Sequence, residues 1–458
     1  MRYISTRNKN IDFSFKEIFL RGLAPDGGLF IPKDIKRYEL DELKDLKKLS
    51  YIDLATEIIL NFCGKDFDKK KLNDLIKKSY KEFKTKNVVE IKKIGNFNFL
   101  ELYNGPTLAF KDIAMQVIGN MYDQFNTAAE KKINIVVATS GDTGAAAISA
   151  LNNRKNINVF VLHPHNKISN IQRKIMTTIG SKNIFNLAVK GTFDDCQKIV
   201  KEMFSDDLFR KKINMSGVNS INWARIICQI VYYFYAVLKL SNDKLSFSVP
   251  TGNFGDVYSG YVAKKMGLPI KKLIVATNEN NILQRVISSG EYKPSKVKPS
   301  LSPSMDIQVS SNFERLLFDL VNQNDQKVSN LMRDLISKGK FNLDKEEINK
   351  INNDFSSAKI TDKETLTIIK NFKDNYNFDL DPHTATAVGA VNKLNIDSEI
   401  VILGTAHPYK FLETIKLATG KKLDPPDQFL NKLKEEEKYD MIDNKLSSIK
   451  DYILKKAI

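Results

Sequence analysis

Short apolar runs recur through the middle of the chain and constrain its fold more than any other feature. They occupy residues 133–138, 159–162, 245–249, 273–276 and 400–403. Several are followed by a Gly-rich turn and then by a stretch with helical periodicity. Buried strands that alternate with helices indicate an α/β architecture with parallel sheets. Because ligands bind beyond the carboxyl ends of such strands, candidate functional residues are expected there.

The regions outside this pattern have a different period. Residues 1–95 are mostly helical in period, except that the Gly/Pro-rich stretch 22–32 predicts a tight turn entering a short strand. Residues 325–378 are polar and predict a peripheral helical insertion. We therefore expect four units along the chain. They are an N-terminal domain (1–95), a large domain (96–132 and 240–425), a small domain (133–239) and a charged C-terminal helical tail (426–458).

Composition limits the class of protein. The chain has 458 residues and is 42% hydrophobic, which is enough for large cores and too much for a disordered protein. A formal net charge of +17 raises nucleic acid or a membrane surface as partners. However, the lysines are spread along the whole chain among Asp and Glu, and no nucleic-acid module is recognisable. We therefore expect neither partner. The positive charge would favour binding of an anionic substrate, but it does not identify that substrate.

Targeting and redox signals favour the cytoplasm. The N-terminal residues 1–7 run into charge without the apolar core of a signal peptide. The most apolar long stretch, residues 223–240, carries Arg225, Gln229 and Lys239, so we interpret it as a buried helix rather than a membrane span. The three cysteines form no pairwise motif and are odd in number, which suits a reducing compartment.

One lysine has unusual surroundings. Lys111 ends the largely apolar run Asn104-Gly-Pro-Thr-Leu-Ala-Phe-Lys111. An ammonium group there would be poorly solvated, which lowers the pKa of the amine, and Asp112 would oppose this only if its carboxylate faced the amine. A neutral lysine in a closed pocket can attack a carbonyl to form a Schiff base. On this feature alone, a snorkelling lysine on an amphipathic helix is the commoner explanation.

Two glycine-containing turns follow strands of the α/β pattern. The turn 139–144 (Thr-Ser-Gly-Asp-Thr-Gly) brings main-chain N–H groups together and adds the hydroxyls of Ser140 and Thr143, which suits a small anion such as a carboxylate. The turn 250–256 (Pro-Thr-Gly-Asn-Phe-Gly-Asp) opens the backbone before a helix, which suits a phosphate. Either turn alone is typical of an ordinary helix N-cap. Together with Lys111 they favour a ligand site.

A third turn, residues 404–408, presents the neutral hydroxyl of Thr405 at a strand end, while His407 is expected to be structural. His163 and His165 have no Cys or carboxylate nearby in sequence to complete a metal site, so we predict no metal. The chain has no Walker A, dinucleotide or Gly-x-Ser-x-Gly fingerprint.

Taken together, these stretches resemble the threonine synthase family, which are pyridoxal-phosphate enzymes of the tryptophan-synthase-β fold type (fold type II). The turn at 22–32 resembles the longer, three-domain branch of the family. The resemblance covers nearly the whole chain, and the order of its matches makes it specific. The matching residues are 22–32, 105–112, 138–144, 191–197, 222–225, 250–256, 276–279, 304–315, 381–384 and 405–411. The implied fold is α/β, with a cofactor-binding and a smaller parallel-sheet domain, a mainly helical N-terminal domain and a C-terminal helical tail.

The resemblance also implies roles for residues in these motifs. Lys111 would form the Schiff base with pyridoxal 5'-phosphate and act as the catalytic base, and Thr405 would hydrogen-bond the pyridine nitrogen. The cofactor phosphate would bind the loop formed by Gly252, Asn253, Phe254, Gly255 and Asp256. The substrate α-carboxylate would bind the loop formed by Ser140, Gly141, Asp142, Thr143 and Gly144. Candidates for orienting the cofactor hydroxyl or the substrate phosphate are Asn222 and Arg225. Candidates for the substrate phosphate or for a structural role are Ser310, Ser311, Asn312 and Arg315.

The implied reaction converts O-phospho-L-homoserine and water to L-threonine and phosphate, by γ-elimination followed by β-addition of water, as the last step of threonine biosynthesis. The chain departs from the family pattern at Asn104, where a His is frequent, and at Tyr409, which replaces a small residue and is expected to narrow the pocket mouth. Two alternatives stay open: a threonine or serine dehydratase-like lyase of the same fold type, and a catalytically silent paralogue that acts as a binding protein. A monomer or a small homo-oligomer is expected.

Overall fold

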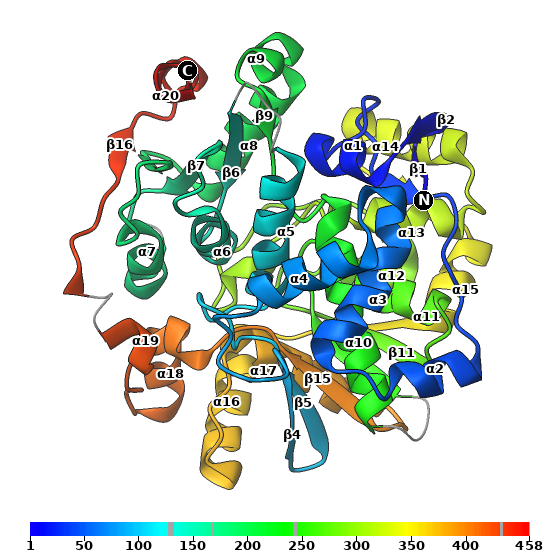
Figure 1. The fold of residues 1–458 in the computed structure, drawn as a ribbon. Coiled ribbons are helices and arrows are strands. Elements are labelled where there is room, and N and C mark those ends of the chain that lie inside the picture. The colour runs from blue at the N-terminus through cyan, green and yellow to red at the C-terminus, as the bar shows by residue number, and fades with distance from the viewer. Residues whose placement is uncertain (127–131, 167, 241–244, 431–433, 458) are drawn as a thin grey trace.

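The computed structural model describes residues 1–126, 132–166, 168–240, 245–430 and 434–457. Two sheets of mainly parallel strands organise these residues, with helices packed around them (Figure 1). This is the α/β architecture predicted from the recurring apolar runs.

The larger sheet has six strands in the order β14-β11-β10-β15-β5-β4. They span Phe355–Lys359 (β14), Ile270–Thr277 (β11), Leu245–Pro250 (β10), Ile400–Gly404 (β15), Phe97–Glu101 (β5) and Glu90–Ile94 (β4). All neighbouring strands are parallel except β4 and β5. The central strands β10 and β15 are buried at every position, as expected for a sheet covered on both faces. The strands predicted within 245–249, 273–276 and 400–403 are confirmed.

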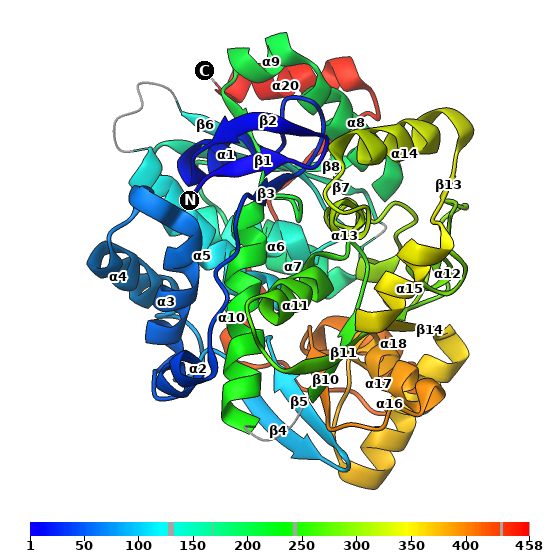
Figure 2. The same cartoon turned by 90° about the vertical axis from the view of Figure 1, so that its right-hand side faces the viewer.

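The smaller sheet has five parallel strands in the order β16-β8-β7-β6-β9. They span Asp440–Ile442 (β16), Ile184–Val189 (β8), Ile157–Pro164 (β7), Ile133–Ala138 (β6) and Met215–Ser216 (β9). Strand β16 was not predicted, because the tail that contains it reads as helical. Helix α20 (Leu446–Ala457) follows β16 and packs Ile449 and Ile453 into the core of this sheet. Figures 1 and 2 both place α20 beside α9 (Asp207–Lys212).

The N-terminal region combines helices with a small antiparallel sheet of order β2-β1-β3. Its elements are β1 (Tyr3–Ser5), β2 (Asn8–Phe13), α1 (Phe15–Arg21), β3 (Phe30–Pro32), α2 (Leu40–Leu46), α3 (Tyr51–Cys63) and α4 (Lys69–Ser79). The predicted turn precedes β3 and has positive φ angles at Gly22 and Gly27. The β1–β2 pair was missed because β2 is largely polar.

Helix α10 (Trp223–Leu240) runs through the centre of the molecule (Figure 2). Among the described residues it is the one helix whose length and composition would allow it to span a membrane, yet 89% of it is buried inside the protein. The prediction of a buried helix is therefore confirmed. The other helices named below or packed on the sheets are α5 (Lys111–Phe125), α6 (Asp142–Leu151), α7 (Asn170–Thr177), α8 (Phe193–Ser205), α11 (Gly255–Lys265), α12 (Ile282–Ser289), α13 (Phe313–Leu320), α17 (Pro382–Leu394), α18 (Leu412–Thr419) and α19 (Asp427–Leu430).

The segment expected as a helical insertion, residues 325–378, also contributes to the larger sheet. It contains α14 (Asp325–Lys338), the short strand β13 (Phe341–Asn342), α15 (Lys345–Asp354) and α16 (Asp362–Tyr376), with β14 before α16. β13 pairs with β12 (Glu291–Tyr292), and β14 is the edge strand next to β11. Strand β4 likewise belongs to the larger sheet although it precedes residue 96, where we expected that unit to begin.

Candidate active site

A large cavity lies where the carboxyl ends of strands from both sheets meet. Its volume is about 1540 Å³. The turns after β6, β10 and β15 line it through residues that include Ser140, Gly252 and Thr405, as does Lys111 at the start of α5. The structure therefore brings together the lysine and the three turns singled out in the sequence. Acidic and basic side chains line the cavity in equal number, so the net charge of +17 is not concentrated there.

Lys111 is a largely buried amine rather than a snorkelling surface lysine. Only 11% of its side chain is exposed. Burial lowers the pKa of the amine, and the carboxylate of Asp142 opposes this shift. Its place as the first residue of α5, at the positive end of the helix dipole, also disfavours a charged amine. Asp112 does not face it, because its carboxylate accepts hydrogen bonds from the N–H and Oγ1 of Thr107 at 2.8 and 2.6 Å.

Asp142 lies between Lys111 and a second buried lysine. Its Oδ2 is 3.4 Å from Nζ of Lys111, and its Oδ1 is 2.5 Å from Nζ of Lys410. Burial alone would raise the pKa of this carboxyl, but Lys410 and Lys111 hold it well below its usual range. Gln172 and Ser304 each donate a further hydrogen bond to it at 3.1 Å. The carboxylate of Asp142 is therefore occupied by the two lysines. An anion at this turn has to bind the main-chain N–H groups and hydroxyls instead.

Thr139 holds the rest of the 139–144 turn in shape from within. Oγ1 of Thr139 accepts hydrogen bonds from the N–H groups of Gly141 and Gly144, both at 2.9 Å. Gly141 has a φ of 134°, which side-chain-bearing residues rarely adopt. Ser140 and Thr143 line the cavity, whereas the two glycines do not and instead shape the turn behind them.

The loop between β10 and α11 lines the cavity from Pro250 to Asp256. Gly252 is so closely packed that a Cβ there would lie 2.7 Å from the main-chain oxygen of Ser304. Phe254 has a left-handed φ of 64°, and α11 begins at the next residue. The first N–H groups of a helix have no intrahelical partner, so this loop and helix start together form an anion cradle.

Arg225, beside this loop, and Asp256, within it, each have one side-chain atom without a hydrogen-bond partner among the described residues. Arg225, in the first turn of α10, lines the cavity and donates from Nη1 to Val218 O at 3.2 Å. Within the described part of the chain its Nε has no partner, and burial lowers its pKa to about 10. Oδ1 of Asp256 accepts from Tyr232 and Tyr233 at 2.5 and 3.0 Å, while its Oδ2 is unpartnered among the same residues. A buried guanidinium with a free N–H suits a phosphate or a carboxylate.

Residues 310–315 brace the loop from outside. Ser310 Oγ and the Asn312 side-chain amide donate to main-chain carbonyls of the loop at 2.7 and 3.0 Å. Arg315 is fully buried and donates to main-chain carbonyls of Phe30 and Ile221 at 3.0 and 2.6 Å. Ser310 and Ser311 line the cavity, but Asn312 and Arg315 do not, which gives these two the structural role.

Two expectations about neighbouring residues are not supported. Asn222 does not line the cavity: its Nδ2 donates to Phe19 O at 3.0 Å and its Oδ1 accepts from the N–H of Ala224 at 3.1 Å, so its polar atoms serve the main chain. Tyr409 is buried and does not line the cavity either, so it does not narrow the pocket mouth. The side-chain amide of Asn104 also bonds to the main chain, donating to Glu101 O at 3.3 Å.

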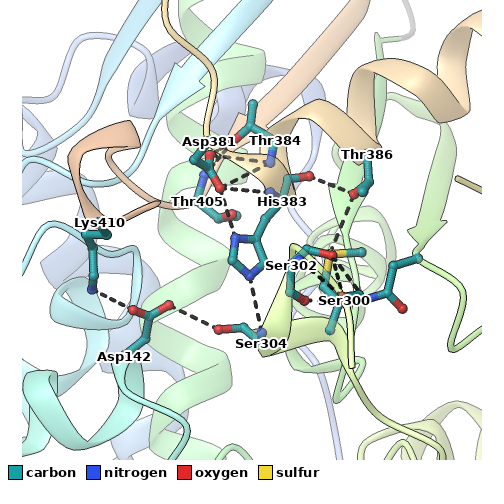
Figure 3. A network of polar contacts seen from close by, with 12 residues as sticks. Asp142, Ser300, Ser302, Ser304, Asp381, His383, Thr384, Thr386, Thr405 and Lys410 are labelled. Atoms are coloured by element: carbon teal, nitrogen blue, oxygen red, sulfur yellow. Dashed lines mark hydrogen bonds and ion pairs between the residues drawn. The ribbon is translucent and has the colours of Figure 1, made fainter. Parts of the chain in front are cut away.

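A hydrogen-bonded chain that sequence reasoning missed starts at Asp142 (Figure 3). Ser304 donates from Oγ to Asp142 and from its main-chain N–H to Nε2 of His383 at 3.2 Å. Because Nε2 accepts, the ring proton is on Nδ1, which lies 2.9 Å from Oδ1 of Asp381. Oγ of Ser304 is also 3.4 Å from Nζ of Lys111. The sequence signal for it is the Asp381-Pro-His-Thr384 run, which matches the family pattern.

The same chain continues to Thr405. Thr384 donates from Oγ1 to Asp381 and accepts from the N–H of Thr405 at 3.3 Å. The carbonyl of Thr405 accepts from the N–H of Phe110 at 2.9 Å, next to Lys111. No hydrogen bond within the described residues occupies the hydroxyl of Thr405, which lines the cavity. Thr405 is therefore fixed through its main chain while its hydroxyl is free for a ligand.

Comparison with known proteins identifies the family. Residues 2–80 match the family model for the threonine synthase N terminus, residues 97–405 that of pyridoxal-phosphate dependent enzymes, and residues 384–453 that of the threonine synthase C-terminal region. A threonine synthase of Pseudomonas aeruginosa is 41% identical over 99% of this chain and 98% of its own length. The chain belongs to the threonine synthase family. Another member, from Saccharomyces cerevisiae, is 45% identical over 91% of this chain and 88% of its own length.

Solved threonine synthase structures have the same fold. The pyridoxal-phosphate-bound enzyme of Brucella melitensis superposes with a TM-score of 0.95 at 39% identity, covering 100% of this chain and 99% of that one. This confirms the fold predicted from the resemblance, fold type II of the pyridoxal-phosphate enzymes.

The cavity of this threonine synthase family member fits that cofactor. Its buried amine, Lys111, can bond to an aldehyde, and the cradle beside Gly252 would be filled by any larger side chain. The orphaned Nε of Arg225 and the free hydroxyl of Thr405 are unused polar groups in the same cavity. These are the donor types that an aldehyde, a phosphate and a ring nitrogen require.

Proposed function

We propose that this chain converts O-phospho-L-homoserine and water to L-threonine and phosphate. The observation that carries the proposal is the buried amine of Lys111, placed in one cavity with two anion-binding turns. One turn suits the α-carboxylate of an amino acid and the other the phosphate of the cofactor. Bound pyridoxal phosphate would supply the group that takes up electrons from the substrate carbon when its proton leaves.

Five groups of residues would hold the cofactor and substrate. Lys111 would bond to the aldehyde carbon, residues 252–256 would bind the cofactor phosphate, and Thr405 would face the ring nitrogen. Ser140 and Thr143, with the main-chain N–H groups of residues 140–144 other than those of Gly141 and Gly144, would bind the substrate carboxylate. Arg225 would bind a phosphate oxygen through its free Nε, because a buried guanidinium is stabilised by an anionic partner. Asn222 is not among these groups, because its polar atoms bond to the main chain.

The side chains of this protein support the proton transfers of the reaction. Lys111, once its amine is free and neutral, accepts the proton that leaves the substrate Cα and returns a proton later. Its lowered pKa keeps a larger share of the amine neutral near pH 7 than an exposed lysine would have. Ser304, 3.4 Å from that amine, provides a hydroxyl that can orient it. Thr405, being neutral, cannot stabilise a protonated ring as an Asp would.

The test is product formation by the purified chain supplied with pyridoxal phosphate. Incubation with O-phospho-L-homoserine should release phosphate and form threonine in equal amounts. Formation of a 2-oxo acid from threonine, without phosphate release from phosphohomoserine, would instead identify a dehydratase. Salt-dependent RNA binding by a chain that takes up no cofactor would identify the silent paralogue.

A lysine pair makes the assignment specific. Lys111→Ala should abolish both the visible absorption of the bound cofactor and turnover, whereas Lys44→Ala, at a largely exposed surface position, should change neither. Borohydride reduction followed by peptide mapping should place the cofactor on Lys111. Cofactor found on any other residue would refute the assignment. We also propose a cytoplasmic monomer or small homo-oligomer without nucleic-acid or membrane partners, which sedimentation with and without RNA or vesicles would check.

A further inference from the structure

Two buried lysines share one carboxylate at the centre of the site. Nζ of Lys410 lies 2.5 Å from Oδ1 of Asp142, while Nζ of Lys111 lies 3.4 Å from Oδ2 of the same group (Figure 3 shows the Lys410 contact). The side chain of Lys410 has no exposed surface, and its amine also donates to Thr107 O at 3.0 Å. Lys410 does not line the cavity. It therefore acts on a ligand only through its neighbours.

The two contacts differ in strength. The Lys410–Asp142 contact is a short, charge-assisted hydrogen bond, whereas the Lys111–Asp142 contact is long. Attraction between charges in a buried site is strong because little water screens it. The carboxylate of Asp142 therefore interacts more strongly with Lys410 than with Lys111. Lys410 also places a second positive charge near Lys111.

The other groups around this pair do not replace that effect. Asp142 also accepts from Gln172 and Ser304, which carry no charge, and the ring of His383 contacts the main chain of Ser304 rather than Lys111. The positive charge of Arg225 also lowers the pKa of Lys111. The one carboxylate within ion-pair distance of Lys111, among the described residues, is therefore Asp142.

We propose that Lys410 is a positioning residue that keeps the free amine of Lys111 neutral, by occupying Asp142 and by its own positive charge. In this state the ion pair of Lys410 and Asp142 stays intact, and the proton given up by Lys111 passes to water in the cavity. The need for a neutral amine rests on the proposed function; the charge relationship between the two lysines does not.

The test measures the titration of Lys111 in the full chain without cofactor. Acetic anhydride labels only neutral amines, so the extent of Lys111 acetylation across a pH series, read by mass spectrometry, gives its midpoint. Lys410→Met should move this midpoint upward by about one pH unit, the lower end of the shift that one nearby charge produces. Lys410→Arg retains the charge and should leave the midpoint close to that of the wild type. The exposed Lys44 provides an internal reference that no variant should alter.

A second readout uses the cofactor without turnover. The rate at which the cofactor-free chain takes up pyridoxal phosphate, followed by absorbance, should rise with pH along the Lys111 titration. Lys410→Met should shift this profile to higher pH by the same amount as the labelling midpoint. A purely structural loss would lower the rate at every pH without shifting the profile.

Three results would overturn the proposal. They are an unchanged Lys111 midpoint in Lys410→Met, a downward shift, and an equal upward shift in Lys410→Arg. If Lys410→Met does not fold, Lys410→Gln takes its place, since its amide retains a donor for Thr107 O. Failure of the proposed function would leave these titrations unaffected, because none of them uses the substrate.

Discussion

The main-chain N–H of Ser304 donates a hydrogen bond to Nε2 of His383, at 3.2 Å. The ring is held on its other side by Asp381, which is also the N-cap of α17. One helix start therefore fixes the imidazole, and the imidazole fixes a serine whose hydroxyl contacts both Lys111 and Asp142.

This arrangement predicts that His383 positions Ser304. His383→Ala removes the acceptor of the Ser304 N–H, and the loss of one buried hydrogen bond of about 1–3 kcal/mol should lower kcat roughly tenfold to hundredfold. KM should change much less, because His383 does not bind the substrate in this scheme. His383→Gln, whose side-chain oxygen can accept near the position of Nε2, should restore part of the loss. Steady-state kinetics of both variants provides the test, and equal losses in Ala and Gln would contradict the positioning role.

The phosphate loop should not tolerate a side chain at Gly252. A Cβ there would lie 2.7 Å from Ser304 O, so Gly252→Ala has to displace the backbone of the cradle or of residue 304. We expect cofactor affinity to fall at least tenfold, about 1.4 kcal/mol, as measured by absorbance titration. Gly339→Ala is the matched control, because its Cβ would meet nothing within 4 Å. That control has a φ of 72° and should lower stability without changing cofactor affinity.

Thr405 should control the balance between the main reaction and side reactions. Thr405→Asp would place a carboxylate where the ring nitrogen is expected, which favours the protonated ring and stronger electron withdrawal. We expect a larger share of side products, such as those of transamination, relative to threonine. Thr405→Ser retains the hydroxyl and should keep the wild-type ratio. Product analysis by chromatography decides this, and an unchanged ratio in Thr405→Asp would count against the assigned contact.

Asp256 should make stability depend on pH. Burial raises the pKa of its carboxyl from 3.8 to about 6. Because the folded chain holds this proton more tightly than the unfolded chain, the stabilising contribution is complete below the unfolded pKa and is lost as pH rises through about 6. Asp256→Asn keeps an acceptor for Tyr232 and Tyr233 and places an amide where Oδ2 is unpartnered.

We therefore expect Asp256→Asn to gain stability relative to the wild type on going from mildly acidic to mildly alkaline pH. The gain should be on the order of 1–3 kcal/mol, since each pKa unit corresponds to about 1.4 kcal/mol. Urea unfolding of the cofactor-free chains at several pH values measures it. A difference between the two chains that is the same at every pH would show that the carboxyl is not perturbed.

The sequence predicted the parts of the fold in which burial produces a run of apolar residues. Strands such as β6 and β15 are largely apolar runs because both faces of their sheets are covered. Of the strands that the sequence did not predict, β2, β14 and β16 lie at sheet edges, where one side of each strand has no neighbour. Strands β1, β5 and β8 lie between two neighbours and were missed as well. Edge strands are short and carry charge, so local periodicity does not reveal them.

The candidate site divides in the same way. Lys111 and the glycine turns were recognisable because their requirements are local: a lysine within an apolar run and glycines where the backbone must bend. Lys410 and Ser304 were missed because their partners, Asp142 and His383, are distant in the chain and only the fold brings them together. Asn222 was wrongly expected at the site. It lies in a family motif, but its side chain forms hydrogen bonds with the main chain.

The smaller sheet is completed by residues at the far end of the chain. Strand β16 pairs with β8, and Ile449 and Ile453 of α20 fill a core that Val136 and Phe160 begin. During synthesis on a ribosome, the apolar face of β6 and β7 would thus be covered only in part, by residues such as Ile199 and Met203 of α8, until residues 440–457 have emerged. The side of the cleft formed by the turn after β6 would then be completed only when translation of the chain is nearly finished.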